Sequence, residues 1–337
     1  MHEARQYEKQ GNNAVQCSLC NHRCTINEGK HGICGVRINE NGTLFAATYG
    51  RISAEAVDPI EKKPLFHYLP GTATYSLGSA GCNFRCRHCQ NWHIARADPD
   101  TASLRPLSPE EAVHRAMESG CRSIAWTYNE PAIWHEYALD MGRLARAAGL
   151  GTIYVTNGYI TEEALRELAP VLTAYRVDLK AFTESFYQKI CGAHLQPVLD
   201  SALLARELGM HIETVTLVIP GLNDSMEEQE QLIRWVIEHL GPDTPMHFSA
   251  FHPDYQMTDR GGTPVATLER IWERAKALGL RYPYLGNVYH HRYENTYCPS
   301  CGALLIERQG FASRNAGLEG SQCRTCGEKT GIVTHVA

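Results

Sequence analysis

The sequence predicts an α/β protein: a partial (β/α)6 barrel of the TIM type, with a small cysteine-rich module at each end. Between residues 71 and 290, short apolar runs alternate with segments whose apolar residues repeat at helical spacing. Near-continuous apolar strands separated by helices indicate a parallel sheet covered by helices. With 337 residues, the chain can form one barrel-sized domain and small appendages. We therefore expect a leading module at 1–70, a barrel at 71–290 and a trailing module at 291–337.

The composition is that of a globular protein, with 43% hydrophobic and 20% charged residues. A net charge of −5 gives no electrostatic reason to expect binding to nucleic acid or to a membrane surface. No apolar run approaches the roughly 20 residues that span a bilayer. The polar stretch Met1–Gln10 does not resemble a secretory signal. We therefore expect a cytoplasmic protein.

The chain has 13 cysteines, and their grouping is more informative than their number. All but two lie in three groups with short spacings: Cys17/Cys20/Cys24/Cys34, Cys82/Cys86/Cys89 and Cys298/Cys301/Cys323/Cys326. Without a secretory signal, this pattern is typical of metal ligation in a reducing compartment rather than of disulfides. The other two, Cys121 and Cys191, are expected to be buried free thiols.

The leading module carries the run Cys17-x2-Cys20-x3-Cys24-x9-Cys34. Four thiols in so short a span fit a closed tetrahedral zinc site. They also fit a second four-iron cluster, because iron–sulfur proteins use tight cysteine runs, and both interpretations remain open. His22 and His31, which lie among these thiols, are expected to be polar loop residues. The stretch Asp58–Pro64 is bounded by prolines and looks like a linker.

Six strands are predicted in the barrel: Ala73–Leu77, Ile124–Trp126, Thr152–Val155, Tyr175–Leu179, Ile212–Ile219 and His247–Phe251. Two of the intervening helices have clear starts, because Ser108 and Ser225 each stand three residues before a Glu, as in a capping box. Pro131 starts a further predicted helix, and Gly149 ends it.

Polar residues follow these strands, at the ends where parallel barrels carry their functional side chains. The segments are Gly81–Cys89, Thr127–Glu130, Thr156–Gly158, Asp178–Lys180, Pro220–Asp224 and His252–Asp254. His211, His247 and His252 also lie near strands, and we expect each to be structural.

The segment Gly81–Cys89 holds three thiols in a C-x3-C-x2-C pattern on a short loop after the first predicted strand. Thiolates are soft ligands that favour iron–sulfur clusters, zinc or copper. A cuboidal four-iron cluster normally has four cysteine ligands. Three cysteines would leave one iron open, and an open position is what a catalytic metal site needs. We therefore interpret Cys82, Cys86 and Cys89 as ligands of a catalytic cluster.

The trailing module carries two C-x2-C-G knuckles, Cys298–Gly302 and Cys323–Gly327. Knuckles at this separation are typical of a zinc ribbon, and a rubredoxin-like single iron is the alternative. We do not expect the nearby Tyr289-His290-His291 to form a further metal site.

Taken in order, these motifs resemble the radical S-adenosylmethionine (SAM) superfamily. Cys82-x3-Cys86-x2-Cys89 matches its cluster motif, and Tyr128-Asn129-Glu130-Pro131 resembles its second-strand motif. Together with that motif, three later ones are similar to those of the activating enzymes of glycyl-radical enzymes such as pyruvate formate-lyase: Thr156-Asn157-Gly158, Asp178-Leu179-Lys180 and Ile219–Asp224. Over nearly its full length the chain resembles the AmmeMemoRadiSam type of this superfamily, which accompanies AMMECR-type and Memo-type proteins.

The resemblance implies a partial barrel of the radical SAM type, with a [4Fe–4S] cluster on Cys82, Cys86 and Cys89 whose fourth iron is chelated by SAM. It implies that His88 packs near the SAM adenine. Further implied cofactor contacts are Asn129 and Glu130 for the SAM amino group, Lys180 for its carboxylate with Asp178 close by, and Thr156 and Asn157 in the same site. Zinc is expected at the trailing knuckles.

The implied activity is reductive cleavage of SAM to a 5′-deoxyadenosyl radical, which abstracts hydrogen from an unidentified substrate. A flavodoxin- or ferredoxin-like protein would supply the electron. The substrate could be a partner protein, as for the activating enzymes, among which AMMECR-type and Memo-type proteins are candidates, or it could be a peptide, nucleotide or small metabolite.

One position departs from the activating enzymes, which place an acid before Thr-Asn-Gly near a monovalent cation. This chain has Val155 there, so we do not carry that cation site over. The alternative from another class is a non-catalytic multi-zinc adaptor or nucleic-acid-associated binding module, in which all three cysteine groups are structural.

Overall fold

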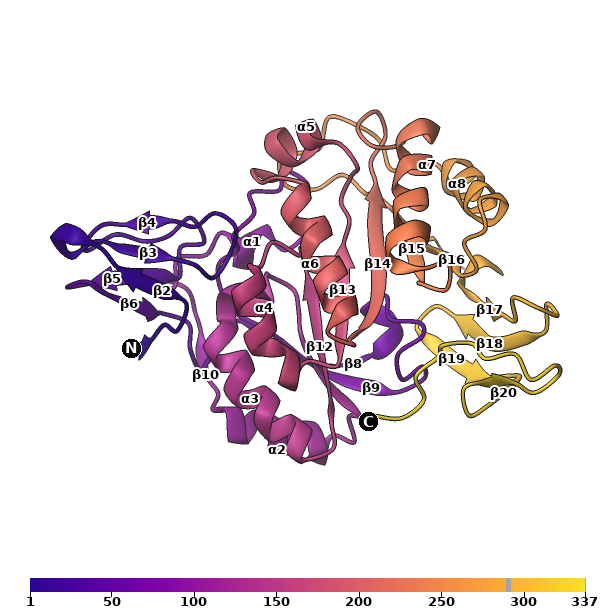
Figure 1. Cartoon of the computed structure of the whole chain (residues 1–337), viewed down its shortest axis with the longest axis horizontal. Helices are drawn as coiled ribbons and strands as arrows, with labels where there is room; N and C mark the ends of the chain where they lie inside the picture. The colour runs from indigo at the N-terminus through magenta and orange to yellow at the C-terminus, as the bar shows by residue number, and fades with distance from the viewer. Residues whose placement is uncertain (289–291, 337) are drawn as a thin grey trace.

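The computed structural model describes residues 1–288 and 292–336. Tyr289, His290 and His291, for which we expected no metal site, lie outside the described residues. A strand-rich N-terminal region lies on one side of a central α/β body, and a second strand-rich region, near the C-terminus, lies on the other (Figure 1). Among the described helices, none has the length and apolar character needed to cross a bilayer.

The central body is built on an eight-stranded sheet with the order β16-β15-β14-β13-β12-β11-β9-β8. Seven strands are parallel: β9 (Ala73–Gly78), β11 (Ser123–Trp126), β12 (Gly151–Thr156), β13 (Ala174–Asp178), β14 (His211–Val218), β15 (Met246–Ala250) and β16 (Pro283–Gly286). The predicted α/β class with a parallel, open barrel-like sheet is confirmed.

Two strands of this sheet were not predicted. β16 has four residues, and Pro283 at its start and Gly286 at its end look like turn residues in the sequence. β8 (Ala54–Pro59) pairs antiparallel with β9 along its whole length. The interpretation of Asp58–Pro64 as a linker was therefore wrong: Asp58 and Pro59 end an edge strand, where proline is tolerated because no ladder donor is lost inside the sheet.

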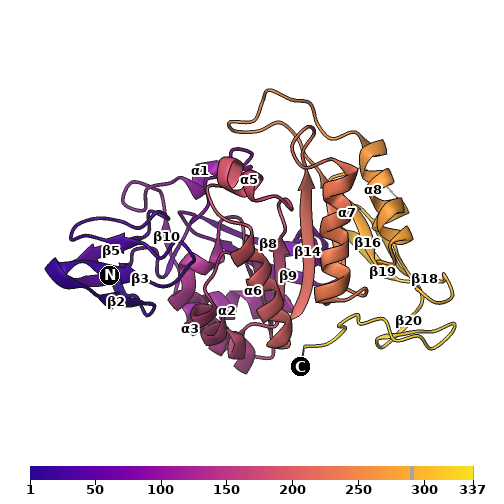
Figure 2. The ribbon, with the colours of Figure 1, turned by 45° about the horizontal axis from the view of Figure 1, so that its top comes forward.

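Helices cover the outer face of the sheet (Figure 2). They are α2 (Pro109–Glu118), α3 (His135–Ala147), α4 (Glu162–Leu168), α6 (Gln196–Glu207), α7 (Met226–Trp235) and α8 (Val265–Ala277), with a 3-10 turn at Pro131–Trp134 before α3. The predicted caps are confirmed, because Ser108 Oγ accepts from Glu111 N at 3.2 Å and Ser225 Oγ accepts from Glu228 N at 3.3 Å. Smaller elements are α1 (Trp92–Ala95), α5 (Glu184–Phe186) and π-helical turns at Tyr187–Cys191 and Val236–Leu240.

The two faces of the sheet pack against different partners, as strand alternation requires. Trp126 and Tyr154 belong to the large apolar core that includes the helices. Ala125, Ile153 and Ala174 instead form a smaller buried cluster with residues of the 60–69 segment. This segment therefore fills part of the inner face of the open barrel.

The N-terminal region is made of short antiparallel strands. One sheet has the order β1-β6-β5 (His2–Glu3, Thr43–Ala46, Arg37–Glu40), and another has the order β2-β3-β4 (Tyr7–Lys9, Val15–Cys17, Thr25–Ile26). β7 (Arg51–Ile52) pairs with β10 (Arg105–Pro106).

A buried ion pair joins this region to the barrel. Arg37 and Glu136 are both almost completely inaccessible to solvent, and their side chains pair at 2.7 Å. Arg37 also donates to the backbone carbonyl of Ile133 at 2.8 Å. Although burial alone would raise the pKa of Glu136, the Arg37 charge lowers it to about 2. The charged form of this pair therefore ties the N-terminal region to the start of α3.

The C-terminal region contains the sheet β17-β18-β19 (Thr296–Tyr297, Leu304–Gln309, Ala312–Asn315) and the hairpin β20-β21 (Leu318–Glu319, Gln322–Cys323). Buried Arg308 in β18 donates to the Phe66 carbonyl at 2.7 Å and lies 4.0 Å from the centre of the Phe66 ring. Val333 exchanges backbone hydrogen bonds with His67 and Leu69. The region is thus anchored on the same 60–69 segment that fills the barrel.

Replacing Arg37 by Met should lower the free energy of unfolding by about 3–5 kcal/mol, because Glu136 would remain buried without its charge partner. The control is Arg23→Met, which removes a solvent-exposed pair with Glu163 and should cost at most about 1 kcal/mol. Urea denaturation of both variants measures the difference. Equal effects would contradict a structural role for the buried pair.

Candidate active site

The carboxyl ends of the parallel strands meet at one edge of the sheet, and the polar segments predicted to be functional lie there. The cysteine loop follows β9, Thr127–Glu130 follows β11, and Asn157 follows β12. Asp178 is the last residue of β13, and Lys180 lies two residues beyond it. The structure therefore brings together the segments that the sequence places at strand ends.

Glycines let the cysteine loop pass close to its neighbours. A Cβ on Gly78 would lie 3.1 Å from the Thr127 carbonyl oxygen. Gly81 has φ of +87°, and a Cβ there would lie only 2.6 Å from the carbonyl oxygen of Cys34. The approach at Gly78 is tight, and the one at Gly81 requires the absence of a side chain and brings the loop against the N-terminal cysteine run.

Asn129 fixes the start of the loop. Its Oδ1 accepts from Ser79 N at 3.0 Å, and its Nδ2 donates to the Gly81 carbonyl at 2.9 Å. The contact of Asn129 with the SAM amino group stays a prediction; in the structure its amide holds the loop backbone. Asn91 Nδ2 ties the far end of the loop to the Tyr128 carbonyl at 2.8 Å.

The middle of the loop rests on the π-helical turn Tyr187–Cys191. Arg85 N donates to the Cys191 carbonyl at 2.7 Å, and Arg87 N donates to the Ile190 carbonyl at 3.0 Å. The Cys191 thiol itself contacts Cys86, and this contact together with burial raises the pKa of Cys86. Cys191 was predicted to be a buried free thiol; it is buried, and it lies beside a candidate cluster ligand.

The three loop thiols are not grouped as ligands of one small ion would be. Burial raises the pKa of Cys82 and of Cys89, and the Lys180 charge opposes the rise at Cys89. Among the described residues, their sulfurs do not form a set lying within 4.8 Å of one another. A single small ion would need such a set, whereas the thiolates of a multi-iron cluster each bind a different iron.

Glu130 ties two of the strand-end loops together. Its Oε1 accepts from Ala132 N at 2.9 Å and from Thr156 Oγ at 2.7 Å, and its Oε2 accepts from Asn157 N at 2.7 Å. Burial raises its pKa to about 7 despite these three donors. The carboxylate thus holds Thr156 and Asn157 in place.

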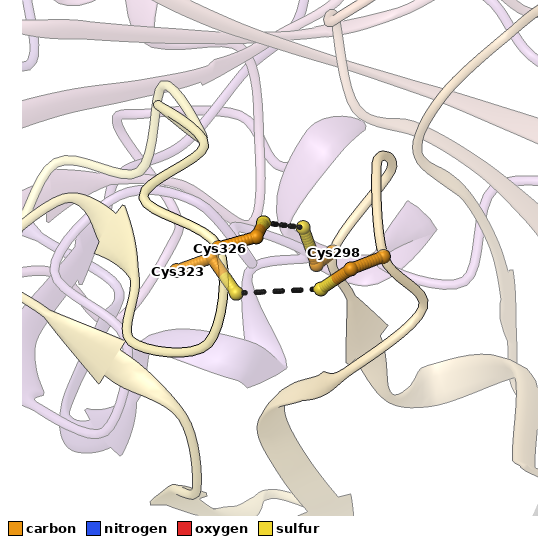
Figure 3. Close-up of side chains that lie close together, drawn as sticks. Cys298, Cys323 and Cys326 are labelled. Carbon is orange, nitrogen blue, oxygen red and sulfur yellow. Dashed lines mark hydrogen bonds between the residues drawn. The ribbon is translucent and has the colours of Figure 1, made fainter.

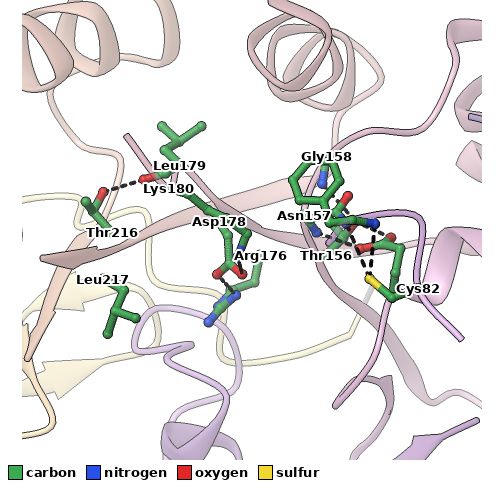
Figure 4. Close-up of polar contacts among 12 residues, drawn as sticks. Cys82, Thr156, Asn157, Gly158, Arg176, Asp178, Leu179, Lys180, Thr216 and Leu217 are labelled. Carbon is green, nitrogen blue, oxygen red and sulfur yellow. Dashed lines mark hydrogen bonds and ion pairs between the residues drawn. The ribbon is translucent and has the colours of Figure 1, made fainter. Parts of the chain in front are cut away.

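Asn157 points from the β12 loop toward the cysteine loop (Figure 4). Its Nδ2 donates to Asn83 Oδ1 at 2.8 Å and lies 4.0 Å from Cys82 Sγ. Gly158 has φ of +75°, and a Cβ there would lie 2.9 Å from Val177. The Thr-Asn-Gly turn therefore depends on its glycine to present Asn157 to the cluster loop.

Asp178 and Lys180 form an ion pair at the end of β13, at 2.8 Å between Oδ2 and Nζ (Figure 4). Arg176, on the same strand, pairs with the other carboxylate oxygen. These two cations offset the burial of Asp178 and lower its pKa. The Lys180 charge also acts on Cys86, so a cation stands beside the cluster loop, where an anionic group of a cofactor can bind.

His88 is buried, and its Nδ1 finds no hydrogen-bond partner among the described residues. Burial and the Lys180 charge lower its pKa to about 3. A neutral ring with a free nitrogen suits packing and hydrogen bonding to a heterocycle.

Asn223 and the histidines act structurally. Asn223 Nδ2 donates to the Lys180 carbonyl at 2.7 Å, which fixes the backbone at the ion pair. His211 and His247 both bind buried Glu213, at 3.0 and 2.8 Å, near the amino ends of their strands. His252 is exposed.

The C-terminal cysteines are grouped as ligands of one ion. The sulfurs of Cys298, Cys301, Cys323 and Cys326 all lie within 4.8 Å of one another. Cys298 faces Cys326 at 3.6 Å, and Cys301 faces Cys323 at 3.7 Å (Figure 3). The two knuckles can therefore hold a metal ion between them.

Three site residues were missing from the sequence-based prediction. Asn83 contacts Asn157 and Cys82, Arg176 pairs with Asp178, and Cys191 contacts Cys86. Asn83 lies inside the cysteine motif, so its position was a usable signal. Arg176 carries a weaker signal, because it is a charged residue inside an otherwise apolar strand.

Comparison with known proteins identifies the class. Residues 77–236 match the family model of the radical SAM superfamily. The chain is 46% identical over 335 residues to an uncharacterized protein of Methanocaldococcus jannaschii, covering 99% of this chain and 100% of that protein. It is 22% identical over 169 residues to a second protein of that organism, which carries the provisional name of a glycyl-radical enzyme activating enzyme, covering 48% of this chain and 62% of that protein.

A solved structure agrees in fold. The SuiB protein of Streptococcus suis, determined with S-adenosylmethionine bound, matches with a TM-score of 0.51 at 15% identity, covering 63% of this chain and 49% of that chain. The chain therefore belongs to the radical SAM superfamily of enzymes, whose domain implies a [4Fe–4S] cluster and SAM.

Changing Glu130 to Gln should lower the free energy of unfolding by about 1–3 kcal/mol, because an amide NH2 cannot accept from one of the three donors and leaves it buried and unpaired. The measurement is urea denaturation above pH 7, where the carboxylate is ionised. Glu162→Gln, which alters an exposed pair with Arg166, is the control and should change stability by less than about 1 kcal/mol. An unchanged Glu130 variant would show that the carboxylate does not hold the turn.

Proposed function

We propose that the chain binds SAM at a [4Fe–4S] cluster held by Cys82, Cys86 and Cys89, and uses reductive cleavage of SAM to abstract hydrogen from a substrate. The observation that carries the proposal is the placement of the three-thiol loop beside Lys180 at the carboxyl edge of the sheet. The cluster motif supplies soft ligands, and the cation supplies a partner for a carboxylate.

The residues present fit the cluster and SAM. Asn83 is completely buried next to Cys82, yet its Nδ2 has no acceptor in hydrogen-bonding geometry among the described residues. Buried donors are rarely left unpaired, so an acceptor such as a cluster sulfur suits this position. His88 Nδ1 is a second buried nitrogen without a partner in the described chain, and we assign it to the adenine side of the site.

When bound, the cluster supplies one-electron reduction of the sulfonium, and the chain's residues orient the reactants. Lys180 offers a point charge to the SAM carboxylate, while its pairing with Asp178 fixes the direction of the ammonium group. Asn157, in the turn after β12, reaches toward the Cys82 thiol. Because Asn129 and Glu130 hydrogen-bond to the neighbouring loops, we assign them first to holding these loops around the SAM amino group.

The substrate and partners are further proposals. A flavodoxin- or ferredoxin-like protein is our proposed electron donor. The similarity to a protein named as an activating enzyme supports a protein substrate, and partners of the AMMECR and Memo types follow from the AmmeMemoRadiSam resemblance. Transfer of deuterium from a labelled candidate into 5′-deoxyadenosine would identify the true substrate, and absence of transfer from every protein candidate would favour a small molecule.

Changing Cys86 to Ala should reduce formation of 5′-deoxyadenosine from SAM to background, because the cluster loses one of its three ligands. The product is measured by chromatography after anaerobic incubation with dithionite. Cys121→Ala is the matched control, since Cys121 is an equally buried thiol outside the site, and it should retain activity. Full activity in the Cys86 variant would overturn the proposal.

We also infer that the C-terminal thiols hold zinc. Zn–S bonds of about 2.3 Å in a tetrahedron place sulfurs about 3.8 Å apart, close to the 3.6 and 3.7 Å between the facing knuckles. The burial of this region against the 60–69 segment suggests a structural role for the ion, in fixing Arg308 on Phe66.

Changing Cys301 to Ala should lower bound zinc by about one ion per chain and leave iron unchanged, because a tetrahedral site needs all four thiolates. Mass spectrometric metal analysis of wild type and variant measures this. If iron falls and zinc does not, the knuckles hold iron instead.

A further inference from the structure

The N-terminal cysteines form a second thiol group that the radical SAM site does not use. Cys17 and Cys20 are buried, and the Cys17 amide donates to the Cys24 carbonyl at 2.9 Å. Cys34 is brought in by a separate turn, in which Gly35 N donates to the Gly32 carbonyl at 2.9 Å. The thiols of Cys17 and Cys34 lie close enough to Cys20 to interact with it electrostatically.

The spacing of these sulfurs differs from that of the C-terminal group. In the described chain, the C-terminal four are the group whose ligand atoms all lie within 4.8 Å of one another, and the N-terminal four do not form such a set. A tetrahedral zinc ion requires sulfurs about 3.8 Å apart. A four-iron cluster spreads its thiolates over separate irons. The loop thiols Cys82, Cys86 and Cys89 share this wider arrangement.

A buried cation faces the group. A Cβ on Gly32 would lie 3.7 Å from Arg37 Cβ and 3.8 Å from Cys34 Sγ, so Arg37 stands beside the thiol group. Arg37 is held in place by Glu136 and the Ile133 carbonyl. A fixed positive charge offsets the negative charge of thiolates, the form in which cysteines bind metals.

The N-terminal thiol group lies directly against the cysteine loop, Gly81–Cys89. The Cys34 carbonyl oxygen faces Gly81, where a Cβ would be 2.6 Å away. His22 Nε2 lies 2.8 Å from the Asn83 carbonyl oxygen. The Asn83 side chain is shared: it contacts Cys20, and its Oδ1 lies 4.0 Å from Cys82 Sγ. One buried amide therefore stands between the two sets of thiols.

We propose that Cys17, Cys20, Cys24 and Cys34 hold a second four-iron cluster, adjacent to the Cys82 loop and joined to it through Asn83. With four protein ligands this cluster has no iron open to SAM, so it is a one-electron centre and not a second catalytic one. Its presence does not depend on SAM cleavage by the first cluster. The proposal rests instead on the spacing of the four sulfurs, which differs from that of the knuckles at the other end of the chain.

Iron and zinc content of anaerobically prepared protein tests the proposal. Wild type should carry about eight irons per chain, against about four if only the loop cluster is present. The variant Cys82→Ala/Cys86→Ala/Cys89→Ala should keep about four irons and give an electron paramagnetic resonance signal on reduction. Wild type with about four irons and about two zincs per chain would overturn the proposal, and this count does not rely on any variant folding.

A matched variant separates this site from the first one. Cys17→Ala/Cys20→Ala should lose about four irons and keep the signal that SAM perturbs, whereas the triple variant should keep a signal that SAM leaves unchanged. In reduced wild type, the spectrum should be broader than the sum of the two variants' spectra, because neighbouring spins couple. A strictly additive spectrum would overturn the placement beside the Cys82 loop, and a SAM-sensitive signal in the triple variant would overturn the assignment of four protein ligands.

Discussion

Seven parallel strands have their carboxyl ends at one edge of the sheet. The site at that edge depends on the hydrogen bonds that the loops there make with one another. Loops with buried backbone donors must find acceptors, and here side chains of the neighbouring loop supply them. Asn129 bonds the start of the cysteine loop, and Glu130 bonds the Thr-Asn-Gly turn. The residues expected to touch the cofactor are thus also the ones that hold the loops around it.

Two kinds of residue shape this edge of the sheet: glycines and charged residues. Glycines at positions 81 and 158 allow close passage where a Cβ would lie 2.6 and 2.9 Å from a neighbour. The charged groups lie at the end of β13, beside the cysteine loop. Lys180 pairs with one oxygen of Asp178, and Arg176 pairs with the other. Because the carboxylate is shared between two cations, Lys180 keeps part of its charge available for an anion at the cluster loop.

Much of this edge was predictable, because strand ends and helix caps are local signals. The cysteine loop, the Thr-Asn-Gly turn and the caps at Ser108 and Ser225 follow from residues close in sequence. β8 and β16 were not predicted, since prolines and glycine at their ends imitate turns and only pairing with β9 and β15 makes them strands. The contacts of Asn83 with Asn157 and of Cys86 with Cys191 join segments far apart in the chain. Local sequence patterns do not predict contacts of this kind.

The two outer cysteine groups show why ligand type and spacing alone cannot assign a metal. Both contain C-x2-C steps, and both have four thiols. In the C-terminal region two such steps face each other across a hairpin, which brings the sulfurs to the separations of a single tetrahedral ion. In the N-terminal region only Cys17 and Cys20 have that spacing, and Cys34 arrives from a turn ten residues beyond Cys24. Among the described residues these sulfurs do not form a set within 4.8 Å of one another, and the region, held by Arg37 on Glu136, places the Cys34 carbonyl against Gly81. Position and spacing together, rather than composition, are the basis of our two proposals, a redox centre for this group and a structural ion for the other.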